Sequence, residues 1–271
     1  MIKNLSLLFL IFAMACKSPE VSEPELMKEA VPVWAESRET EMNLTLGFQG
    51  VFQAEKNSGF NLRITASTLY RVFLNGEFLG YGPARTAHGF FRVDEYDIGD
   101  VVKSGENILA IEVAGYNVNT YYTLDQPSFL QAELESDGKI VLATGNETGF
   151  KAFELKERLQ KVERYSFQRP FTEYYRIAEG FDDWKTSADI PLTPVELAEQ
   201  SGGKLIPRNL FMPEFETLQP EEIYAKGTVG FQKPERYYKD RSLVRISENF
   251  KGYPEPELKV LPSQRMQEIT T

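Results

Sequence analysis

Paired carboxylates are the residues of this 271-residue chain whose type and spacing most readily suggest chemistry. Two neighbouring carboxyl groups can act as general acid and general base in a hydrolysis. The acidic pairs are Asp182-Asp183, Glu214 with Glu216, and Glu221-Glu222. All of them fall in stretches typical of loops or linkers, where acidic side chains are usually solvated. We therefore predict no catalytic residue in this chain.

The chain has one histidine, His88, and one cysteine, Cys16. A triad of the Ser–His–Asp or Cys–His type would have to use His88, which we interpret as a surface or interdomain contact. One cysteine builds neither a disulfide framework nor a cysteine-rich zinc site. We predict no metal site and no cofactor. Calcium is compatible with a sugar-binding sandwich, but the sequence contains no concentrated Asp/Asn loop that would indicate it.

The charge balance argues against nucleic acid as a partner. The 30 basic and 40 acidic residues give a net charge of −10, whereas binding phosphate needs clustered Lys and Arg. We interpret the acidic balance as a contribution to solubility. Hydrophobic residues make up 42% of the chain, which is ordinary for a globular protein with a buried core.

The N-terminus has the pattern of an export signal. Lys3 precedes an apolar stretch from Leu5 to Ala15, which as a helix would span roughly 16 Å and is too short for a transmembrane helix. Its Ala-Met-Ala-Cys ending resembles a bacterial lipoprotein signal. That resemblance implies cleavage after residue 15, lipidation of Cys16, and attachment to the membrane of the cell envelope through the lipid alone. Residues 16–40 are predicted to form a tether.

From residue 41 to 205 the pattern predicts a mainly β fold, a jelly-roll β-sandwich with short helices, followed by an extended C-terminal segment. Residues 44–53 and 60–66 alternate apolar and polar side chains, as half-buried strands do. Asn75-Gly76 and Asp137-Gly138 each lie between apolar runs. Such pairs favour two-residue hairpin turns. Many short strands with close turns are typical of a sandwich.

Two stretches have helical features, and the C-terminal part has few features of either kind. Residues 155–165 carry apolar side chains at helical spacing, and residues 194–202 begin with proline and end near glycine. Beyond 205, prolines recur and apolar residues are scattered. We interpret residues 206–271 as a linker or the start of a further, incomplete β domain.

A loop rich in tyrosine is the best candidate for a binding site. Residues 115–122, GYNVNTYY, follow a predicted strand directly, and loops of a sandwich commonly present ligand contacts. Tyrosine rings suit sugar C–H surfaces, and amides donate and accept hydrogen bonds. The candidate carbohydrate-binding residues are Tyr116, Asn117, Asn119, Tyr121, Tyr122, Arg85 and Trp184. Each has an alternative role: the tyrosines in packing, Arg85 in a turn, and Trp184 as a loop anchor.

Residues 72–117 resemble the jelly-roll domain that precedes the catalytic domain in many glycoside hydrolases. The shared skeleton is Asn75-Gly76, Gly80, Tyr96-Asp97-Ile98 and Gly105-Glu106-Asn107. The run Gly82-Pro83-Ala84-Arg85, residues 169–176 and residues 205–208 are similar to the N-terminal region of bacterial α-L-rhamnosidases of glycoside hydrolase family 78. The resemblance covers residues 45 to 215 and implies a galactose-binding-like jelly roll.

In that family the catalytic carboxylates lie downstream in an (α/α)6 barrel and act as an inverting acid and base. Nothing after residue 215 has the length or periodicity of such a barrel. We therefore expect a non-catalytic N-terminal part of an α-L-rhamnosidase-like enzyme that degrades rhamnose-containing glycans, with carbohydrate and a barrel in a longer or adjacent chain as partners. A stand-alone carbohydrate-binding surface lipoprotein is the alternative.

Overall fold

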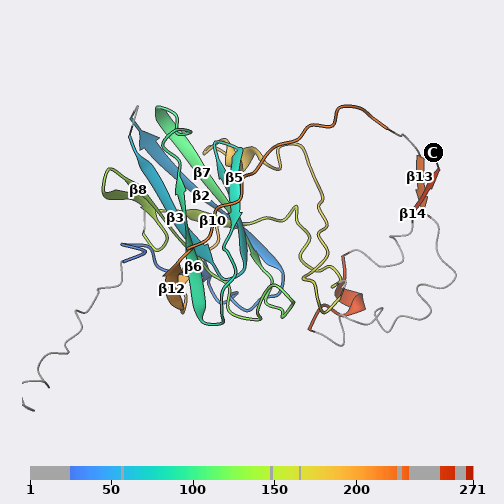
Figure 1. Cartoon of the computed structure of the whole chain (residues 1–271). Helices are drawn as coiled ribbons and strands as arrows, with labels where there is room; N and C mark the ends of the chain where they lie inside the picture. The colour runs from blue at the N-terminus through green and yellow to red at the C-terminus, as the bar shows by residue number, and fades with distance from the viewer. Residues whose placement is uncertain are drawn as a thin grey trace, which may run out of the picture.

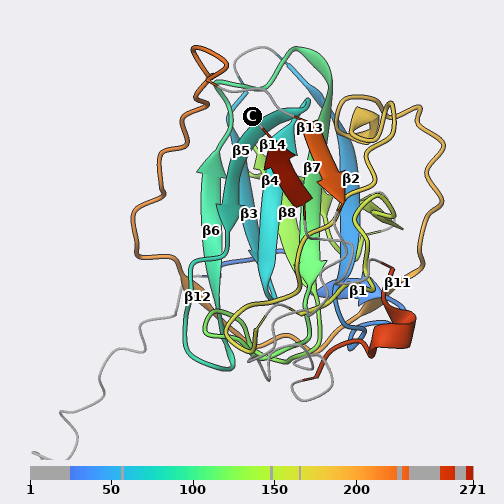
Figure 2. The ribbon, with the colours of Figure 1, turned by 90° about the vertical axis from the view of Figure 1, so that its right-hand side faces the viewer.

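A computed structural model describes residues 25–55, 58–146, 149–164, 166–224, 228–231, 251–259 and 267–270. Figure 1 and Figure 2 show two β-sheets that face each other. Within these residues the only helices are the short 3-10 helices η1 (Asp183–Lys185) and η3 (Glu255–Glu257). The predicted mainly β sandwich is confirmed.

The sheets contain seven, five and two strands. The seven-stranded sheet contains β1 (Val33–Ala35), β3 (Phe60–Ala66), β6 (Phe90–Asp97), β8 (Leu130–Ser136), β9 (Lys139–Ala143), β11 (Leu197–Glu199) and β12 (Lys204–Pro207). The five-stranded sheet contains β2 (Leu44–Ala54), β4 (Leu69–Leu74), β5 (Glu77–Gly82), β7 (Gly105–Gly115) and β10 (Lys151–Glu154). Strands β13 (Thr228–Phe231) and β14 (Gln267–Thr270) pair with each other.

The strand order is that of an eight-stranded jelly roll. The first sheet contains the order β1-β8-β3-β6 and the second the order β2-β7-β4-β5, so the chain crosses between sheets after nearly every strand. Pairing of Ala66 with Leu130, and of Leu69 with Ala114, places the ends of β3 and β7 beside the starts of β8 and β4. The β3–β4, β5–β6 and β7–β8 loops therefore lie at one end of the sandwich.

Both predicted hairpin turns form at the predicted residues. Asn75 and Gly76 have φ of 51° and 87° and join β4 to β5. Asp137 and Gly138 have φ of 48° and 83° and join β8 to β9. Positive φ at both central residues is what a type I′ turn requires, and Asn, Asp and Gly tolerate it best.

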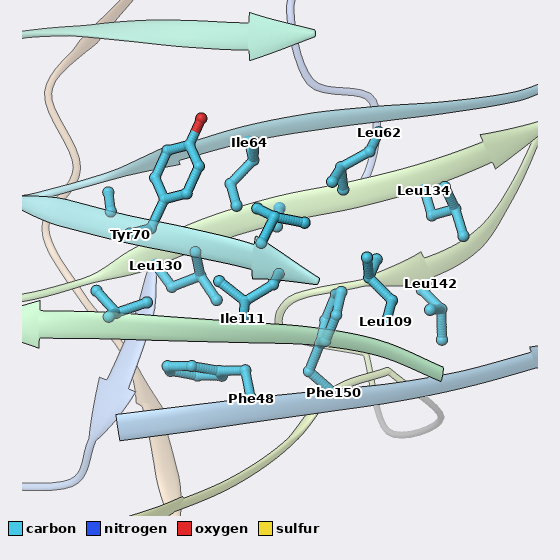
Figure 3. Close-up of a cluster of buried hydrophobic side chains, with 14 of the residues drawn as sticks. Phe48, Leu62, Ile64, Tyr70, Leu109, Ile111, Leu130, Leu134, Leu142 and Phe150 are labelled. Carbon is cyan, nitrogen blue, oxygen red and sulfur yellow. The ribbon is translucent and has the colours of Figure 1, made fainter. Parts of the chain in front are cut away.

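The main core lies between the two sheets, as Figure 3 shows. Leu109, Ile111 and Val113 alternate along β7 and belong to this core, because every second side chain of a strand points to the same face. They meet Leu62 and Ile64 of β3, together with Leu130 and Leu134 of β8. Each such fully buried side chain stabilises the fold by about 1.5–3 kcal/mol relative to its exposed state.

Within the described residues 25–40, the segment before β2 belongs to the sandwich, which corrects that part of the tether predicted over residues 16–40. Strand β1 pairs with β8 and β11, and Trp34 is fully buried. The carboxylate of Glu133 on β8 accepts hydrogen bonds from the backbone N–H groups of Lys28, Glu29 and Ala30. Long-range pairing of this kind leaves no local signature in a polar segment. Residues 1–15 and Cys16 lie outside the described residues.

Neither predicted helix forms. Residues 158 and 164 make isolated bridges with Tyr175 and Phe171, and the backbone N–H of Leu159 donates to Tyr174 O at 2.9 Å. The stretch 155–164 thus pairs with a later stretch instead of with itself. Within 194–202, β11 pairs with β1. Short helices are marginal without packing, so tertiary pairing overrides the local pattern.

The C-terminal part has little regular structure in the part described. Residues 208–224 contain no strand, and side chains such as Phe211 and Tyr224 are exposed. The β13–β14 pair is separate from the two large sheets in hydrogen bonding. No helix in the described ranges is both long and apolar enough to cross a membrane.

The hydrogen bonds that Glu133 accepts from residues 28–30 can be tested as the N-terminal anchor, meaning the contact that attaches this segment to the sandwich. Its side chain is fully buried and also pairs with Arg63 at 2.9 Å. Glu133→Gln removes the charge that three backbone donors and one guanidinium share. We expect it to lower the free energy of unfolding by roughly 2–3 kcal/mol, measured by urea denaturation. The matched control is Glu95→Gln on the exposed face of β6, expected to be neutral; equal effects would contradict the anchor.

Candidate functional site

The loop end of the sandwich contains a pocket of about 310 Å³. Its walls come from the β3–β4, β5–β6 and β7–β8 loops. Polar and aromatic side chains from these loops that line it are Arg85, Thr86, His88, Thr120, Tyr121 and Tyr122. Pockets of this size, with a few convergent polar groups, are typical of small-ligand sites.

The β7–β8 loop leaves the sheet through two buried residues. Asn117 has φ of 49°, and its Nδ2 donates to Glu41 O at 3.1 Å and to Ser128 Oγ at 2.8 Å. Tyr116 is buried, and its hydroxyl accepts a hydrogen bond from Arg158 Nη2 at 3.3 Å. Asn tolerates the left-handed conformation better than most residues. These contacts fix the direction in which the loop departs.

Thr120 then shapes the tip of the loop. Its Oγ1 accepts hydrogen bonds from the backbone N–H groups of Tyr122 and Thr123, both at 2.9 Å. The backbone N–H of Thr120 donates to Thr123 O at 2.9 Å. A threonine hydroxyl that bonds to nearby backbone in this way stabilises a tight turn. The turn holds Tyr121 and Tyr122 outward, with exposed fractions of 63% and 44%.

Two guanidinium groups lie over the ring of Tyr122. The Cζ atom of Arg85 is 4.8 Å from the ring centroid, and that of Arg169 is 5.2 Å away. Contacts of this kind are cation–π interactions, each contributing about 0.5–1 kcal/mol at an exposed site. Tyr121 beside it makes an edge contact with Phe167 at 5.8 Å between centroids. Three separate parts of the sequence therefore meet at Tyr122: its own loop, Arg85 and Arg169.

Arg92 on β6 holds the β5–β6 loop in place. Its Nε donates to Arg85 O at 3.0 Å, and its Nη1 donates to Pro207 O at 3.2 Å and Arg208 O at 2.6 Å. Strand β12, which ends at Pro207, runs parallel to β6. The guanidinium thus links the loop to the segment that follows the sandwich. One side chain positions both.

A buried polar cluster lies beneath this loop. Asp94 on β6 is fully buried, accepts a hydrogen bond from the Tyr70 hydroxyl, and pairs with Arg208 Nη1 at 2.6 Å. Burial, together with the neighbouring Asp94 charge, raises the pKa of Tyr70 well above its ordinary value, and burial raises the pKa of Tyr96 to about 12. A Cβ at Gly82 would lie 2.0 Å from Asp94 Oδ2. Only glycine fits there.

The structure brings some predicted residues together and separates others. Tyr121, Tyr122 and Arg85 share the pocket. Tyr116 and Asn117 are 4% and 1% exposed and support the loop from below, which corrects their prediction as sugar contacts. Asn119 lines an adjoining hollow instead, where its Oδ1 accepts a hydrogen bond from the Asp125 backbone N–H.

Trp184 is also corrected. It is 3% exposed and packs its ring against Phe153 in an edge contact at 4.8 Å. The backbone carbonyl of Trp184 accepts a hydrogen bond from Gln49 Nε2 at 2.5 Å. A ring covered in this way offers no face to a ligand. It is the loop anchor that the sequence left open as its alternative role.

The sequence reasoning missed Arg169 and Arg92 as parts of this site. Arg169 begins the stretch 169–176 that carries part of the family resemblance, but no local pattern predicts that it contacts Tyr122. Its contact with Tyr122 depends on how residues 158–175 fold back on themselves. Arg92 could only be found from its hydrogen bonds to two distant carbonyls.

The acidic pairs do not meet across a pocket. Asp182 pairs with Lys185 at 2.7 Å near η1, and the four glutamates from 214 to 222 are exposed. Within the residues that the structure describes, no three or more His, Cys, Asp or Glu side chains are grouped to hold a metal ion.

Comparison with known proteins gives structural similarity without a family assignment. No protein-family model matches the chain, and no curated protein matches it. The fold matches part of the GH78 family rhamnosidase of Bacillus sp. GL1, with 27% identity and a TM-score of 0.60. It also matches part of the α-L-rhamnosidase of Aspergillus terreus, with 19% identity and a TM-score of 0.51.

Both matches cover 68% of this chain but only 20% and 23% of the enzymes. The chain thus corresponds to about a fifth of their length. A lectin from Pleurotus ostreatus matches over 63% of this chain and 47% of its own, with 16% identity and a TM-score of 0.33, which is too low to carry an argument. The chain is therefore a jelly-roll sandwich similar to one domain-sized portion of family 78 rhamnosidases.

The burial of both tryptophans generates a direct test of the site geometry. The chain contains two, Trp34 and Trp184, exposed to 0% and 3%. We expect acrylamide to quench the fluorescence of the folded chain several-fold less than that of the chain in concentrated urea, because no indole is accessible. A component of the folded-state emission that is quenched as readily as in urea would place Trp184 at the surface and restore it as a candidate.

Proposed function

We propose that this chain is a non-catalytic, carbohydrate-binding part of an α-L-rhamnosidase-like glycoside hydrolase. The observation that carries the proposal is the pocket at the loop end, where Tyr121, Tyr122 and Arg85 meet. The 27% identity to the Bacillus rhamnosidase over 68% of the chain supports the enzyme class. In this proposal the glycan contains rhamnose.

The composition of the pocket suits a sugar. The exposed rings of Tyr121 and Tyr122 offer apolar faces to sugar C–H groups. Thr86 lines the same pocket and offers a hydroxyl that both donates and accepts hydrogen bonds. Because these loops sit on a rigid two-sheet core, the contacts are held in a fixed arrangement before a ligand arrives.

In this proposal the catalytic carboxylates belong to a different domain. Inverting hydrolysis needs two carboxyl groups roughly 6.5–9.5 Å apart around the sugar. None of the residues lining the pocket, within the described part of the chain, is an Asp or a Glu. A catalytic (α/α)6 barrel, in a longer or adjacent chain, would supply them. The sandwich would hold glycan near it.

A stand-alone carbohydrate-binding lipoprotein is the second candidate. The observation in its favour is that loops and strand ends of this sandwich line the pocket, with Arg169 beside it over Tyr122. Binding would then need no other domain. Both candidates share the lipid anchor at Cys16 and the bacterial cell envelope as the location.

Binding to rhamnose-containing oligosaccharides, measured by glycan array and calorimetry, tests the shared part of both candidates. We expect Tyr121→Ala and Tyr122→Ala to weaken binding about five-fold each, because an aromatic contact contributes about 1 kcal/mol. Tyr224→Ala is the matched control, since Tyr224 is exposed and outside the pocket.

Two outcomes would overturn this account. If no rhamnose-containing saccharide binds, or if Tyr224→Ala weakens binding as much as the pocket variants do, the loop end is not the site. The same preparation is expected to leave an aryl α-L-rhamnoside intact. Clear turnover would show that the chain has its own catalytic carboxylates.

The lipid anchor has an independent test. Expression of the full chain in bacteria fed a labelled fatty acid should label the protein, because acylation of the Cys16 thiol supplies the anchor. Cys16→Ser should remove the label and release the protein from the membrane fraction. Since Cys16 is the only cysteine, no other thiol can mask the result. Label retained in Cys16→Ser would contradict the proposal.

A further inference from the structure

Two arginines that lie over Tyr122, Arg85 of the pocket lining and Arg169 beside it, lack the side-chain ion pairs and hydrogen bonds that most arginines of the described residues make. Arg85 and Arg169 are exposed, and neither guanidinium has an ion pair or a hydrogen bond to another described residue. In contrast, the following arginines each lie within 4 Å of a carboxylate: Arg38, Arg63, Arg71, Arg158 and Arg208. Two guanidinium groups without ion pairs are therefore gathered at Tyr122, a lining residue of the pocket, in a chain whose net charge is −10.

The position of these arginines over an aromatic ring prepares them for an anion. A guanidinium is planar, and its five N–H donors point outward in that plane. When the flat face lies on an aromatic ring, the edge donors remain available and the side chain loses less freedom on binding. Such an edge matches a carboxylate or sulfate bidentately. Arg85 and Arg169 over Tyr122 place two such edges within one small region.

Nothing described in the pocket competes for these cations. Its lining includes Arg85, Arg92 and His88 but no acidic residue among the described positions. Asp125 belongs to the adjoining hollow, where it pairs with Lys251 at 2.6 Å.

The geometry points to an anionic saccharide as the ligand of this pocket, one that bears a carboxylate or a sulfate ester. The guanidinium edges of Arg85 and Arg169 bind the anionic group, and the exposed ring of Tyr121 contacts the sugar. Arg92 acts as a positioning residue, since it holds the carbonyl of Arg85 at 3.0 Å. This inference rests on the proposed carbohydrate-binding function and narrows its ligand class.

The test uses one disaccharide in two charge states. A uronate–rhamnose disaccharide and its methyl ester differ only at the carboxyl group, which is an anion in the first and a neutral ester, one methyl group larger, in the second. We expect the full chain to bind the carboxylate form about ten- to a hundred-fold more tightly, as charge-assisted hydrogen bonds predict. The preference should shrink at high salt. A sulfated rhamnoside and its unsulfated parent form the second arm and show which anion is preferred.

Variants assign the preference to residues. Arg85→Gln with Arg169→Gln should abolish the charge preference, because the carboxylate form should lose about ten- to a hundred-fold more affinity than the methyl ester loses. Both side chains are exposed, so circular dichroism should show an intact sandwich. Arg176→Gln is the matched control, because Arg176 is exposed, is outside the pocket lining and, unlike Arg85 and Arg169, does not lie over Tyr122. It should keep the full preference.

The possible outcomes distinguish a failure of the anionic-ligand inference from a failure of the proposed carbohydrate-binding function. Equal affinity for the acid and its ester, with measurable binding of both, overturns the anionic ligand and leaves carbohydrate binding in place. Absence of binding by either sugar overturns both. Inorganic sulfate that binds as tightly as the disaccharide, and is lost in the double variant, would reduce the pocket to an anion site and overturn the saccharide.

Discussion

The charge of Asp94 is the constraint on which the rest of the loop end depends. This carboxylate is fully buried, and a buried charge without partners costs several kcal/mol. Its partners come from different parts of the chain: Tyr70 on β4 of the opposite sheet, and Arg208 beyond β12. Satisfying one carboxylate therefore fixes the separation of the two sheets at this end. It also fixes the path of the chain after the sandwich.

The same constraint explains the residues that carry the family resemblance. Gly82 is required because any side chain there would collide with Asp94. Arg208 ends the Leu-Ile-Pro-Arg run and supplies the countercharge. Arg92 ties both runs together through its bonds to Arg85 and Arg208 carbonyls. Two motifs that are distant in sequence thus form one support, and the pocket lies above it.

The features of the fold that could be predicted from the sequence are those that depend on residues close together in the chain. The Asn75-Gly76 and Asp137-Gly138 turns depend on φ preferences of two adjacent residues, and the strands at residues 44–53 and 60–66 depend on simple alternation. Strand β1 and the irregular pairing of residues 155–164 could not be read, because distant partners decide them.

The approximate position of the binding site could be predicted because it also depends on a local pattern. The tyrosine-rich loop follows a recognisable strand, so its position at the end of the sandwich was accessible. Which of its residues point outward was not, because that depends on the left-handed conformation at Asn117 and the Thr120 turn. The burial of Trp184 and the arrival of Arg169 at Tyr122 are tertiary contacts without a local pattern.

The most direct measurement of the central claim is a nuclear magnetic resonance titration of the isotope-labelled chain with a rhamnose-containing oligosaccharide. The account predicts amide shift changes confined to residues 83–89, 120–123 and 167–169. Changes centred instead on the outer face of the five-stranded sheet, around Glu112 and Glu173, or no changes at saturating ligand, would contradict it.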